Sequence, residues 1–197
     1  DCKGFLYRHR TGEVIDLTVD IMEARSDCRD SGGRLGPATT WCKPDLRNFK
    51  LSYVECEKGD ILVMGSDGLH DNLDPQSIGK TVQELGYPQG EDWDSIDPEE
   101  VAQLKNDYRC WLLKQLAFRC LPGEVPDPKH VAMRLVRHCL GTTRRSRDFM
   151  ETYEDKKLPE NYQEYPGKMD HTSIVCVRVH KLPRPNKSKS RPRVHEE

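Results

Sequence analysis

An apolar run at residues 61–64 leads directly into a polar turn, within "GDILVMGSDGLHDNLDP" at residues 59–75. Hydrophobic and polar residues do not alternate in this run, which predicts a strand covered on both faces. The turn carries Asp67, His70 and Asp71. An isolated Asp-Gly pair is usually explained by turn geometry alone, because both residues tolerate tight backbone angles. Whether Asp67 has a further role depends on what the rest of the chain places beside it.

Three other segments have the composition of strands. "GFLYRHRTGEVIDLTVD" (residues 4–20) has β-prone residues on both sides of Thr11-Gly12 and predicts a hairpin. "KLSYVEC" (residues 50–56) predicts a strand that a turn joins to the apolar run. "TSIVCVRV" (residues 172–179) predicts a last strand, apolar enough to be central in a sheet.

Three Asp-Pro pairs predict the starts of helices, since Asp can cap a helix and Pro fits its first position. The first helix is expected to run to about Leu85, where Gly86 would end it. The second is expected over about 98–118 and the third over 128–140. The pairs are Asp74-Pro75, Asp97-Pro98 and Asp127-Pro128.

The two long helices have apolar stripes that predict their buried faces. In the second helix these residues are Val101, Leu104, Tyr108, Trp111, Leu112 and Leu116. In the third they are Val131, Leu135, Val136 and Cys139.

The order of these elements predicts an α+β layered domain, with strands at both ends of the chain and helices between them. Residues 24–50 are expected to be a Gly- and Pro-rich connection, and residues 142–168 a long loop. Residues 181–197 are rich in Pro, Lys and Arg and predict a disordered basic tail. The domain is therefore expected over 1–180. Such a tail is usually only solvated, and the alternative is a role in targeting or in binding an anionic partner.

Composition narrows the function classes. The chain has 197 residues, enough for one domain with a full core, and a formal net charge of −2, which gives no strong field for nucleic acid. No apolar run approaches a membrane span, and no signal sequence is recognisable. The first residue is Asp1, in what reads as the middle of a strand motif, so we expect the chain to be a fragment of a longer protein.

Cysteine spacing argues against zinc and against a disulfide framework. The chain has eight cysteines, but none form a Cys-x-x-Cys pair and no His lies at zinc-ligand spacing beside them. Cys139 and Cys176 lie within apolar segments and are predicted to be small buried hydrophobic residues in a reducing compartment. We therefore expect an intracellular protein, cytoplasmic or nuclear.

Three aspartates lie next to predicted strands. Asp67 follows the apolar run, Asp170 precedes the last strand, and Asp1 precedes the hairpin. Carboxylates gathered at strand ends repel one another unless divalent cations lie between them. Oxygen ligands without Cys or clustered His favour Mg²⁺ or Mn²⁺ over zinc. A paired-metal centre of this kind activates water and neutralises a transferring phosphoryl group.

Three stretches together resemble the metal-dependent protein phosphatase family of PPM type, also called type 2C. "GDILVMGSDGLHDNL" is similar to the central strand of that family and its Asp-Gly-x-(aromatic)-Asp turn. "GKMDHTSIVCVRV" resembles the family's closing motif, an Asp-Asn pair that leads into the final core strand. "DCKGFLYRHRTGEVIDLT" resembles its hairpin that begins Gly-Asp-Ser-Arg. Each motif alone is weak, but the three occur in the family's order.

The resemblance implies an α-β-β-α sandwich of two antiparallel sheets flanked by helices. It implies that Asp67 and Asp170 are ligands of a binuclear Mg²⁺ or Mn²⁺ centre, and that Asp1 is linked to a third, weaker metal. The implied reaction is hydrolysis of phosphoserine or phosphothreonine on a phosphoprotein substrate, without a phosphoenzyme intermediate. The implied molecule is a monomer that binds no nucleic acid.

The chain also departs from the family pattern. His70 replaces the usual aromatic residue, His171 stands where Asn is common, and Cys2-Lys3 replaces Ser-Arg. Residues 29–48 occupy the place of a flap motif and match it poorly. The family's upstream Asp-Gly-His-Gly motif and phosphate-binding Arg do not occur, so we expect the C-terminal portion of the domain, inactive by itself.

Two classes of function remain open. The first is a metal-dependent Ser/Thr protein phosphatase, and the alternative is a pseudophosphatase, a scaffold or binding domain with the same fold. The presence of both Asp67 and Asp170 favours the enzyme, because a scaffold needs neither carboxylate. A lone His is more often a surface or hydrogen-bonding residue than a catalyst, so neither His70 nor His171 is assigned a role and no catalytic residue is named. Asp71 is typical of a turn.

Overall fold

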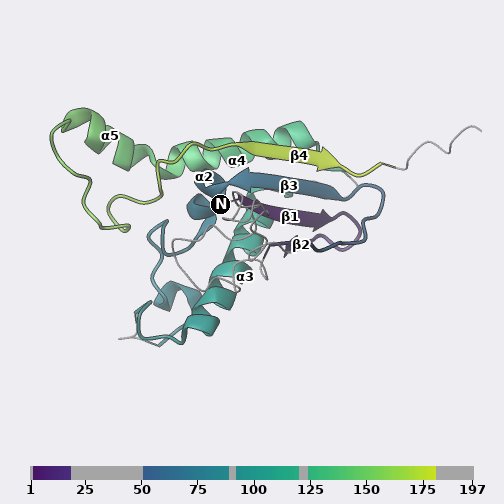
Figure 1. Ribbon diagram of the computed structural model, residues 1–197, viewed down its shortest axis with the longest axis horizontal. Helices are drawn as coiled ribbons and strands as arrows, with labels where there is room; N and C mark the ends of the chain where they lie inside the picture. Colours follow the sequence, from purple (N-terminus) through teal and green to yellow (C-terminus); the bar gives the residue numbers. More distant parts are fainter. Residues whose placement is uncertain (1, 19–50, 89–91, 120–123, 181–197) are drawn as a thin grey trace, which may run out of the picture.

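The protein is described here by a computed structural model covering residues 2–18, 51–88, 92–119 and 124–180. In these ranges four strands form one antiparallel sheet in the order β2-β1-β3-β4 (Figure 1). The strands are β1 (Cys2–Arg8), β2 (Glu13–Asp16), β3 (Ile61–Ser66) and β4 (Ile174–Arg178). The α-helices are α2 (Asp67–His70), α3 (Pro98–Ala117), α4 (Pro128–Thr142) and α5 (Arg144–Thr152), and Asp71–Leu73 and Gln83–Leu85 are 3-10 turns.

The strand register divides the sheet into two faces. Val63 of β3 lies opposite Phe5 on one side and opposite Cys176 on the other, and these three side chains share the face that α3 and α4 cover. Tyr7 of this face stacks on Phe118, with ring centroids 4.0 Å apart and the planes almost parallel. Burial of these apolar side chains between sheet and helices is the main source of stability.

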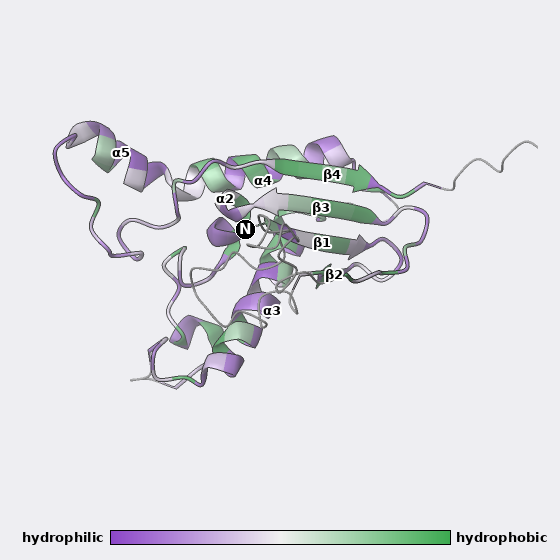
Figure 2. Cartoon of the chain, in the orientation of Figure 1, coloured by the Kyte–Doolittle hydropathy of each residue, from purple (hydrophilic) through white to green (hydrophobic). Residues whose placement is uncertain are grey.

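The second face of the sheet is apolar but open at β3 and β4. Met64 lies opposite Val175, and both are on this face with Val177. Met64 is 43% exposed, Val175 52% and Val177 48%. The run at residues 61–64 is therefore buried at Ile61 and Val63, but the prediction of cover on both faces is wrong for Met64. In Figure 2, β3 and β4 are hydrophobic along most of their length.

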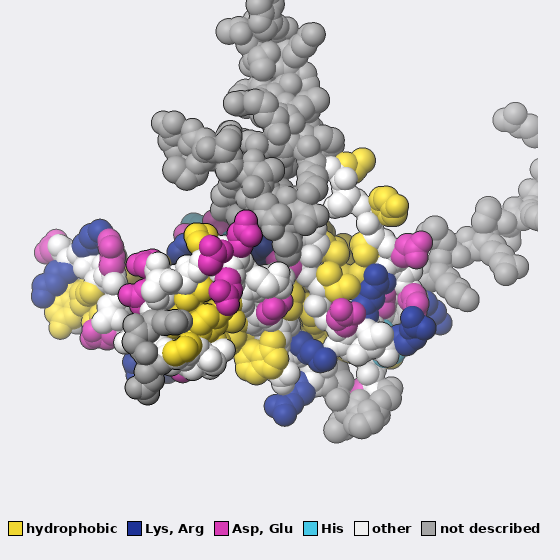
Figure 3. Space-filling view, turned by 90° about the horizontal axis from the view of Figure 1, so that it is seen from below, with side chains coloured by type: hydrophobic (Ala, Val, Ile, Leu, Met, Phe, Trp, Pro, Cys, Tyr) yellow, Lys and Arg dark blue, Asp and Glu magenta, His cyan; other side chains and the backbone are white. Residues whose placement is uncertain are grey.

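The fold class is α+β, as expected. The described residues contain a single four-stranded sheet, so a sandwich of two sheets is not seen in this part of the chain. Viewed from below, the described surface has hydrophobic side chains among acidic and basic ones (Figure 3). No helix within the described ranges combines the length and the hydropathy needed to cross a membrane.

The two long helices form where predicted, but their buried faces differ from expectation. In α3 the fully buried residues are Leu113 and Ala117, whereas Trp111 is 53% exposed. Tyr108 and Trp111 contact each other at the surface, with ring centroids 5.3 Å apart. The apolar stripe predicted for this helix places large residues on two neighbouring faces. In the folded protein only the face that carries Leu113 and Ala117 is fully buried. In α4 three of the four expected residues are buried, and only Val136 is exposed.

The predicted helix from Pro75 to Leu85 does not form. Asp74 Oδ1 accepts a hydrogen bond from Ser77 N at 3.1 Å, which closes a turn instead of capping a helix. Gly79 then takes a φ of +82°, a left-handed conformation that ends any right-handed helix. Its backbone packs against the Tyr162 carbonyl so closely that a Cβ would lie 2.3 Å from that oxygen.

Two other expectations are also wrong. Residues 51–57 are exposed and form no strand, because no strand among the described residues lies beside them to form a β-ladder. The expected loop at 142–168 contains helix α5, where the Phe149 ring packs against Tyr153 and Tyr165 with centroids 5.0 Å from each. These local aromatic contacts stabilise a helix whose sequence is otherwise strongly polar.

The cysteines in the described ranges are all free. Cys139 is buried, and Cys110 and Cys176 are partly buried, as expected for small apolar residues. Cys2 and Cys56 are exposed. Asp1 and the tail at residues 181–197 lie outside the described residues.

We predict that Leu135→Ala lowers the free energy of unfolding by about 2–5 kcal/mol, because it leaves a cavity under the sheet. Leu135 is fully buried in the core cluster. Urea denaturation followed by circular dichroism measures the loss. The matched control is Leu51→Ala at an 85% exposed leucine, which should change stability by less than about 0.5 kcal/mol. Equal losses in the two variants would contradict the core assignment.

A candidate metal site where β3 ends and β4 begins

The end of β3 is tied to the segment that precedes β4. Ser66 N donates to Ser173 O at 3.1 Å, and Ser66 Oγ donates to His171 O at 2.8 Å. Ser173 N in turn donates to Ser66 Oγ at 3.1 Å. These bonds extend the β3–β4 pairing by one residue and hold residues 171–173 against the start of α2.

Asp67, the first residue of α2, is half-buried, and its Oδ1 accepts a hydrogen bond from Gly68 N at 2.8 Å. The backbone of Gly68 touches the segment that carries Asp170 (residues 167–173, the Asp170 segment). A Cβ at Gly68 would lie 2.7 Å from His171 O and 2.9 Å from Asp170 O, so no larger residue fits without movement. The structure thus brings the predicted residues Asp67 and Asp170 onto adjoining segments, although 103 positions separate them in the chain.

Asn72 joins the same two segments through its side chain. Its Nδ2 donates to Gly68 O at 2.8 Å and to Lys168 O at 2.9 Å, and its Oδ1 accepts from Lys168 N at 3.2 Å. The residue is 1% exposed. The sequence around Asn72 gives no signal of this role, because an Asn after a turn motif is usually part of the turn itself.

An ion pair reinforces this connection at the surface. Lys168 Nζ lies 2.9 Å from Asp71 Oδ2, and His70 Nδ1 lies 3.1 Å from Asp71 Oδ1. Burial tends to raise the pKa of Asp71, but the interactions with His70 and Lys168 outweigh it and lower the pKa to about 2. The bond to Asp71 raises the pKa of Lys168, and the nearby charge of Asp170 acts in the same direction. Asp71, which the sequence predicted only as a turn residue, therefore also joins α2 to Lys168 through an ion pair.

Helix α4 closes the inner side of this region. His138 Nε2 lies 2.8 Å from Asn72 O, and burial lowers the pKa of His138. Burial raises the pKa of the Cys139 thiol to about 11, so this thiol is not a nucleophile at neutral pH. Between α4 and the Asp170 segment is a cavity of about 260 Å³. Its lining includes Asn72, Cys139, Arg147, Lys168, Asp170 and Thr172.

The donor chemistry of Asp67 and Asp170 fits a hard divalent cation. Carboxylate oxygens are the protein ligands that Mg²⁺ and Mn²⁺ prefer, and both ions usually keep several waters. Asp1, the third predicted ligand, lies outside the described residues. Within residues 2–18, 51–88, 92–119 and 124–180 no group of three or more His, Cys, Asp or Glu is arranged to hold a metal ion. Asp67 and Asp170 would therefore supply only some of the ligands that a divalent cation needs.

His70 and His171, the two histidines that flank the expected site, have different surroundings. His70 is 5% exposed, and its Nε2 has no hydrogen-bond partner among the described residues. His171 is exposed, and its carbonyl, not its ring, makes the contact with Ser66. Neither ring is assigned a catalytic role.

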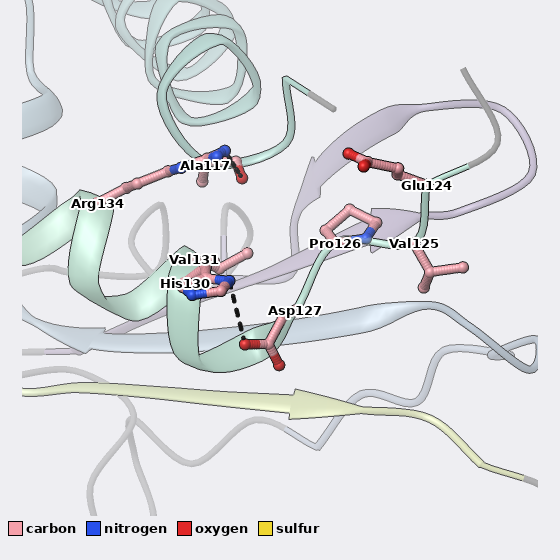
Figure 4. Close-up of a pocket in the computed structure, with 8 residues that line it drawn as sticks. All are labelled: Ala117, Glu124, Val125, Pro126, Asp127, His130, Val131 and Arg134. Atoms are coloured by element: carbon pink, nitrogen blue, oxygen red, sulfur yellow. Dashed lines mark hydrogen bonds and ion pairs between the residues drawn. The ribbon is translucent and has the colours of Figure 1, made fainter. Parts of the chain in front are cut away.

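A second cavity, of about 290 Å³, lies at the opposite end of β3 and β4 (Figure 4). Its lining residues are Ala117, Glu124, Val125, Pro126, Asp127, His130, Val131 and Arg134. Asp127 and His130 form an ion pair at 3.3 Å, and Arg134 donates to Ala117 O at 3.3 Å. The charged side chains of Asp127, His130 and Arg134 thus already have partners within the protein. We therefore take the site at Asp67 as the candidate functional site.

Comparison with known proteins gives one informative match. Over 85 residues the chain is 42% identical to the PP2C-like domain-containing protein CG9801 of Drosophila melanogaster. The match covers 42% of this chain and 12% of that protein. No family model matches the chain, and no solved structure matches it. The similarity supports a relationship to PP2C-like proteins over part of the chain.

We predict that Gly68→Ala destabilises the protein by about 1–3 kcal/mol, because the added methyl group forces the Asp170 segment away from α2. Chemical denaturation measures the change. Gly141→Ala is the matched control, since a Cβ at Gly141 in α4 meets no atom within 4 Å. That change should be neutral or stabilise by up to about 1 kcal/mol. A neutral Gly68→Ala variant would contradict the close contact.

A second prediction follows from the ion pair of Asp71. Its pKa of about 2 lies below the unfolded value of 3.8, so the carboxylate stabilises the fold above pH 3.8. This contribution is lost as the pH falls from 3.8 toward 2. Asp71→Asn should therefore cost about 1–2 kcal/mol near neutral pH and little at the acid end. Urea titrations across this range test it, with the exposed Asp94→Asn variant as control. A pH-independent loss would contradict the assignment.

Proposed function

We propose that this chain is part of a PP2C-like, metal-dependent protein phosphatase that hydrolyses phosphoserine and phosphothreonine. The observation that carries the proposal is the contact between the turn of Asp67 and the segment of Asp170. The two segments that carry these aspartates come from distant parts of the chain and meet where β3 ends, and packing alone does not require an aspartate on each of them. A divalent cation bound by both aspartates would give the two carboxylates a chemical role there. The partial similarity to a PP2C-like domain-containing protein of Drosophila adds support.

Asp67 and Asp170 would hold one Mg²⁺ or Mn²⁺, and a binuclear centre would need further ligands. Asp1 is proposed to contribute to a third, weaker site. Bound divalent cations supply Lewis acidity for in-line displacement at phosphorus. The part of this chain is to orient the ligands. The hydrogen bond from Gly68 N orients the Asp67 carboxylate, and the hydrogen bonds of Asn72 fix the backbone that leads to Asp170.

The open apolar face of the sheet supports a second proposal about the domain. Met64, Val175 and Val177 form an exposed apolar group on β3 and β4. Such a face is normally covered by another layer. We propose that a second antiparallel sheet covers it, giving the α-β-β-α sandwich. Residues 1–180 would then be the C-terminal portion of the domain, and 181–197 a disordered basic tail.

The remaining features of the proposal follow from the family resemblance and the composition. The protein would act on phosphoproteins as a monomer, without binding nucleic acid. Its free cysteines suit a reducing compartment, cytoplasmic or nuclear. A pseudophosphatase scaffold is the second candidate. It is favoured by one observation, the absence of a group of three metal-binding side chains within the described ranges.

The decisive experiment compares the full-length protein that contains this chain with residues 1–197 alone. The full-length protein should hydrolyse p-nitrophenyl phosphate and phosphopeptides with Mn²⁺ or Mg²⁺, and EDTA should abolish the activity. Asp67→Asn and Asp170→Asn should each lower kcat by about a hundredfold or more, since each removes a metal ligand. The exposed Asp148→Asn variant in α5 is the control and should retain full activity.

Residues 1–197 alone should show no turnover. Two aspartates can hold one cation with waters, and phosphate monoesters are among the slowest substrates to hydrolyse without catalysis. Metal-dependent turnover by this chain alone, abolished by Asp67→Asn, would show that no other ligands are needed. A full-length protein that binds Mn²⁺ but has no activity would favour the scaffold.

A further inference from the structure

The buried carboxamide of Asn72 links two segments that are far apart in the sequence. Both donors of its Nδ2 are used, one on Gly68 O and one on Lys168 O. Its Oδ1 accepts from Lys168 N, so Asn72 pairs with both backbone groups of Lys168 as a neighbouring strand would. Asn72 is 1% exposed, so these hydrogen bonds are shielded from solvent.

The residues that Asn72 holds are close neighbours of the two proposed ligands. Gly68 directly follows Asp67, and Lys168 lies two positions before Asp170. Gly167 takes a φ of +81°, and a Cβ there would lie 2.4 Å from Asn72 Oδ1. The Asp170 segment can therefore reach Asn72 only because its first residue has no side chain.

Asn72 is itself held from a third element. His138 Nε2 of α4 lies 2.8 Å from Asn72 O, which orients the backbone of the residue against the helix layer. The position of Asn72 is thus set by the core, and the positions of both ligand segments are set by Asn72. Ligands held in this way lose less freedom when a cation binds, because they are oriented before it arrives.

We infer that Asn72 is a positioning residue for the metal site: its carboxamide sets the approach of the Asp67 and Asp170 carboxylates to a divalent cation. The inference rests on the proposed function. It goes beyond it by assigning cation affinity in part to a neutral residue that does not touch the cation. Groups that orient metal ligands typically contribute about 10–100-fold to affinity.

A merely structural role has a different signature, which Ser146 provides as a control. Ser146 is also fully buried, and its Oγ donates to Pro166 O at 3.2 Å, one residue before the segment that Asn72 holds. It makes no bond to Gly68 or to Lys168. Ser146→Ala therefore removes a buried hydrogen bond of the same loop without releasing the two ligand segments.

The test uses Asn72→Leu, which keeps the shape of the side chain, and Asn72→Ser, which is small and polar, in the full-length protein. The Kd for Mn²⁺ is measured from the electron paramagnetic resonance signal of the free ion. Both variants should raise it by about tenfold or more. In the metal-free protein, hydrogen exchange of peptides covering 167–173 should accelerate in both variants, while exchange in β1 and β3 stays unchanged. Ser146→Ala should lower the thermal midpoint but leave the Kd unchanged.

The outcomes separate the inference from the proposed function. If wild-type protein binds no Mn²⁺, or if its binding is insensitive to Asp67→Asn, the proposed function fails and the role of Asn72 toward a metal fails with it. If binding depends on Asp67 but folded Asn72 variants bind Mn²⁺ like wild type, the inference alone is overturned. Equal loss of affinity in Ser146→Ala would likewise reduce Asn72 to a structural residue.

Discussion

The antiparallel pairing of β3 with β4 is the interaction on which the rest of the structure depends. It joins residues 61–65 to residues 174–178, segments that have the four α-helices of the described chain between them. Without this pairing the sheet loses one of its four strands, and α4 loses a large part of the surface it packs on. The same pairing brings the end of β3 to the start of β4. The candidate site is therefore a direct result of the strand order.

Helices cover only one of the two faces of the sheet, which leaves an apolar face exposed on the other side. One face packs on α3 and α4 through fully buried residues such as Val63 and Leu135. The opposite face has Met64 and Val177 in contact with solvent, although both are apolar. Strands with apolar side chains on both faces are typical of sheets inside layered domains. A second layer over this face would make the hydropathy of β3 and β4 consistent with their surroundings.

Polar contacts at the candidate site are arranged from the inside outward. Asn72 is buried and neutral, Asp71 and Lys168 form a partly exposed ion pair, and Asp170 is exposed. Neutral hydrogen bonds are best suited to the dry interior, where an unpaired charge is costly. Charged groups are left where water and ions can reach them. This order lets hydrogen bonds hold the base of the segment that carries Asp170 while Asp170 itself stays exposed to solvent.

Sequence patterns alone predicted the hairpin of β1 and β2, the strands β3 and β4, the helices α3 and α4, and the residues Asp67 and Asp170 as a candidate pair. Local rules suffice for these, because apolar periodicity, Asp-Pro starts and turn residues act over a few positions. Tertiary structure decided the rest. Contact with Tyr162 and a left-handed Gly79 replaced a predicted helix by turns, and packing on the sheet chose Leu113 over Trp111 as the buried face of α3. The role of Asn72 could not be predicted, because its partner Lys168 lies 96 residues away and only the folded chain brings them together.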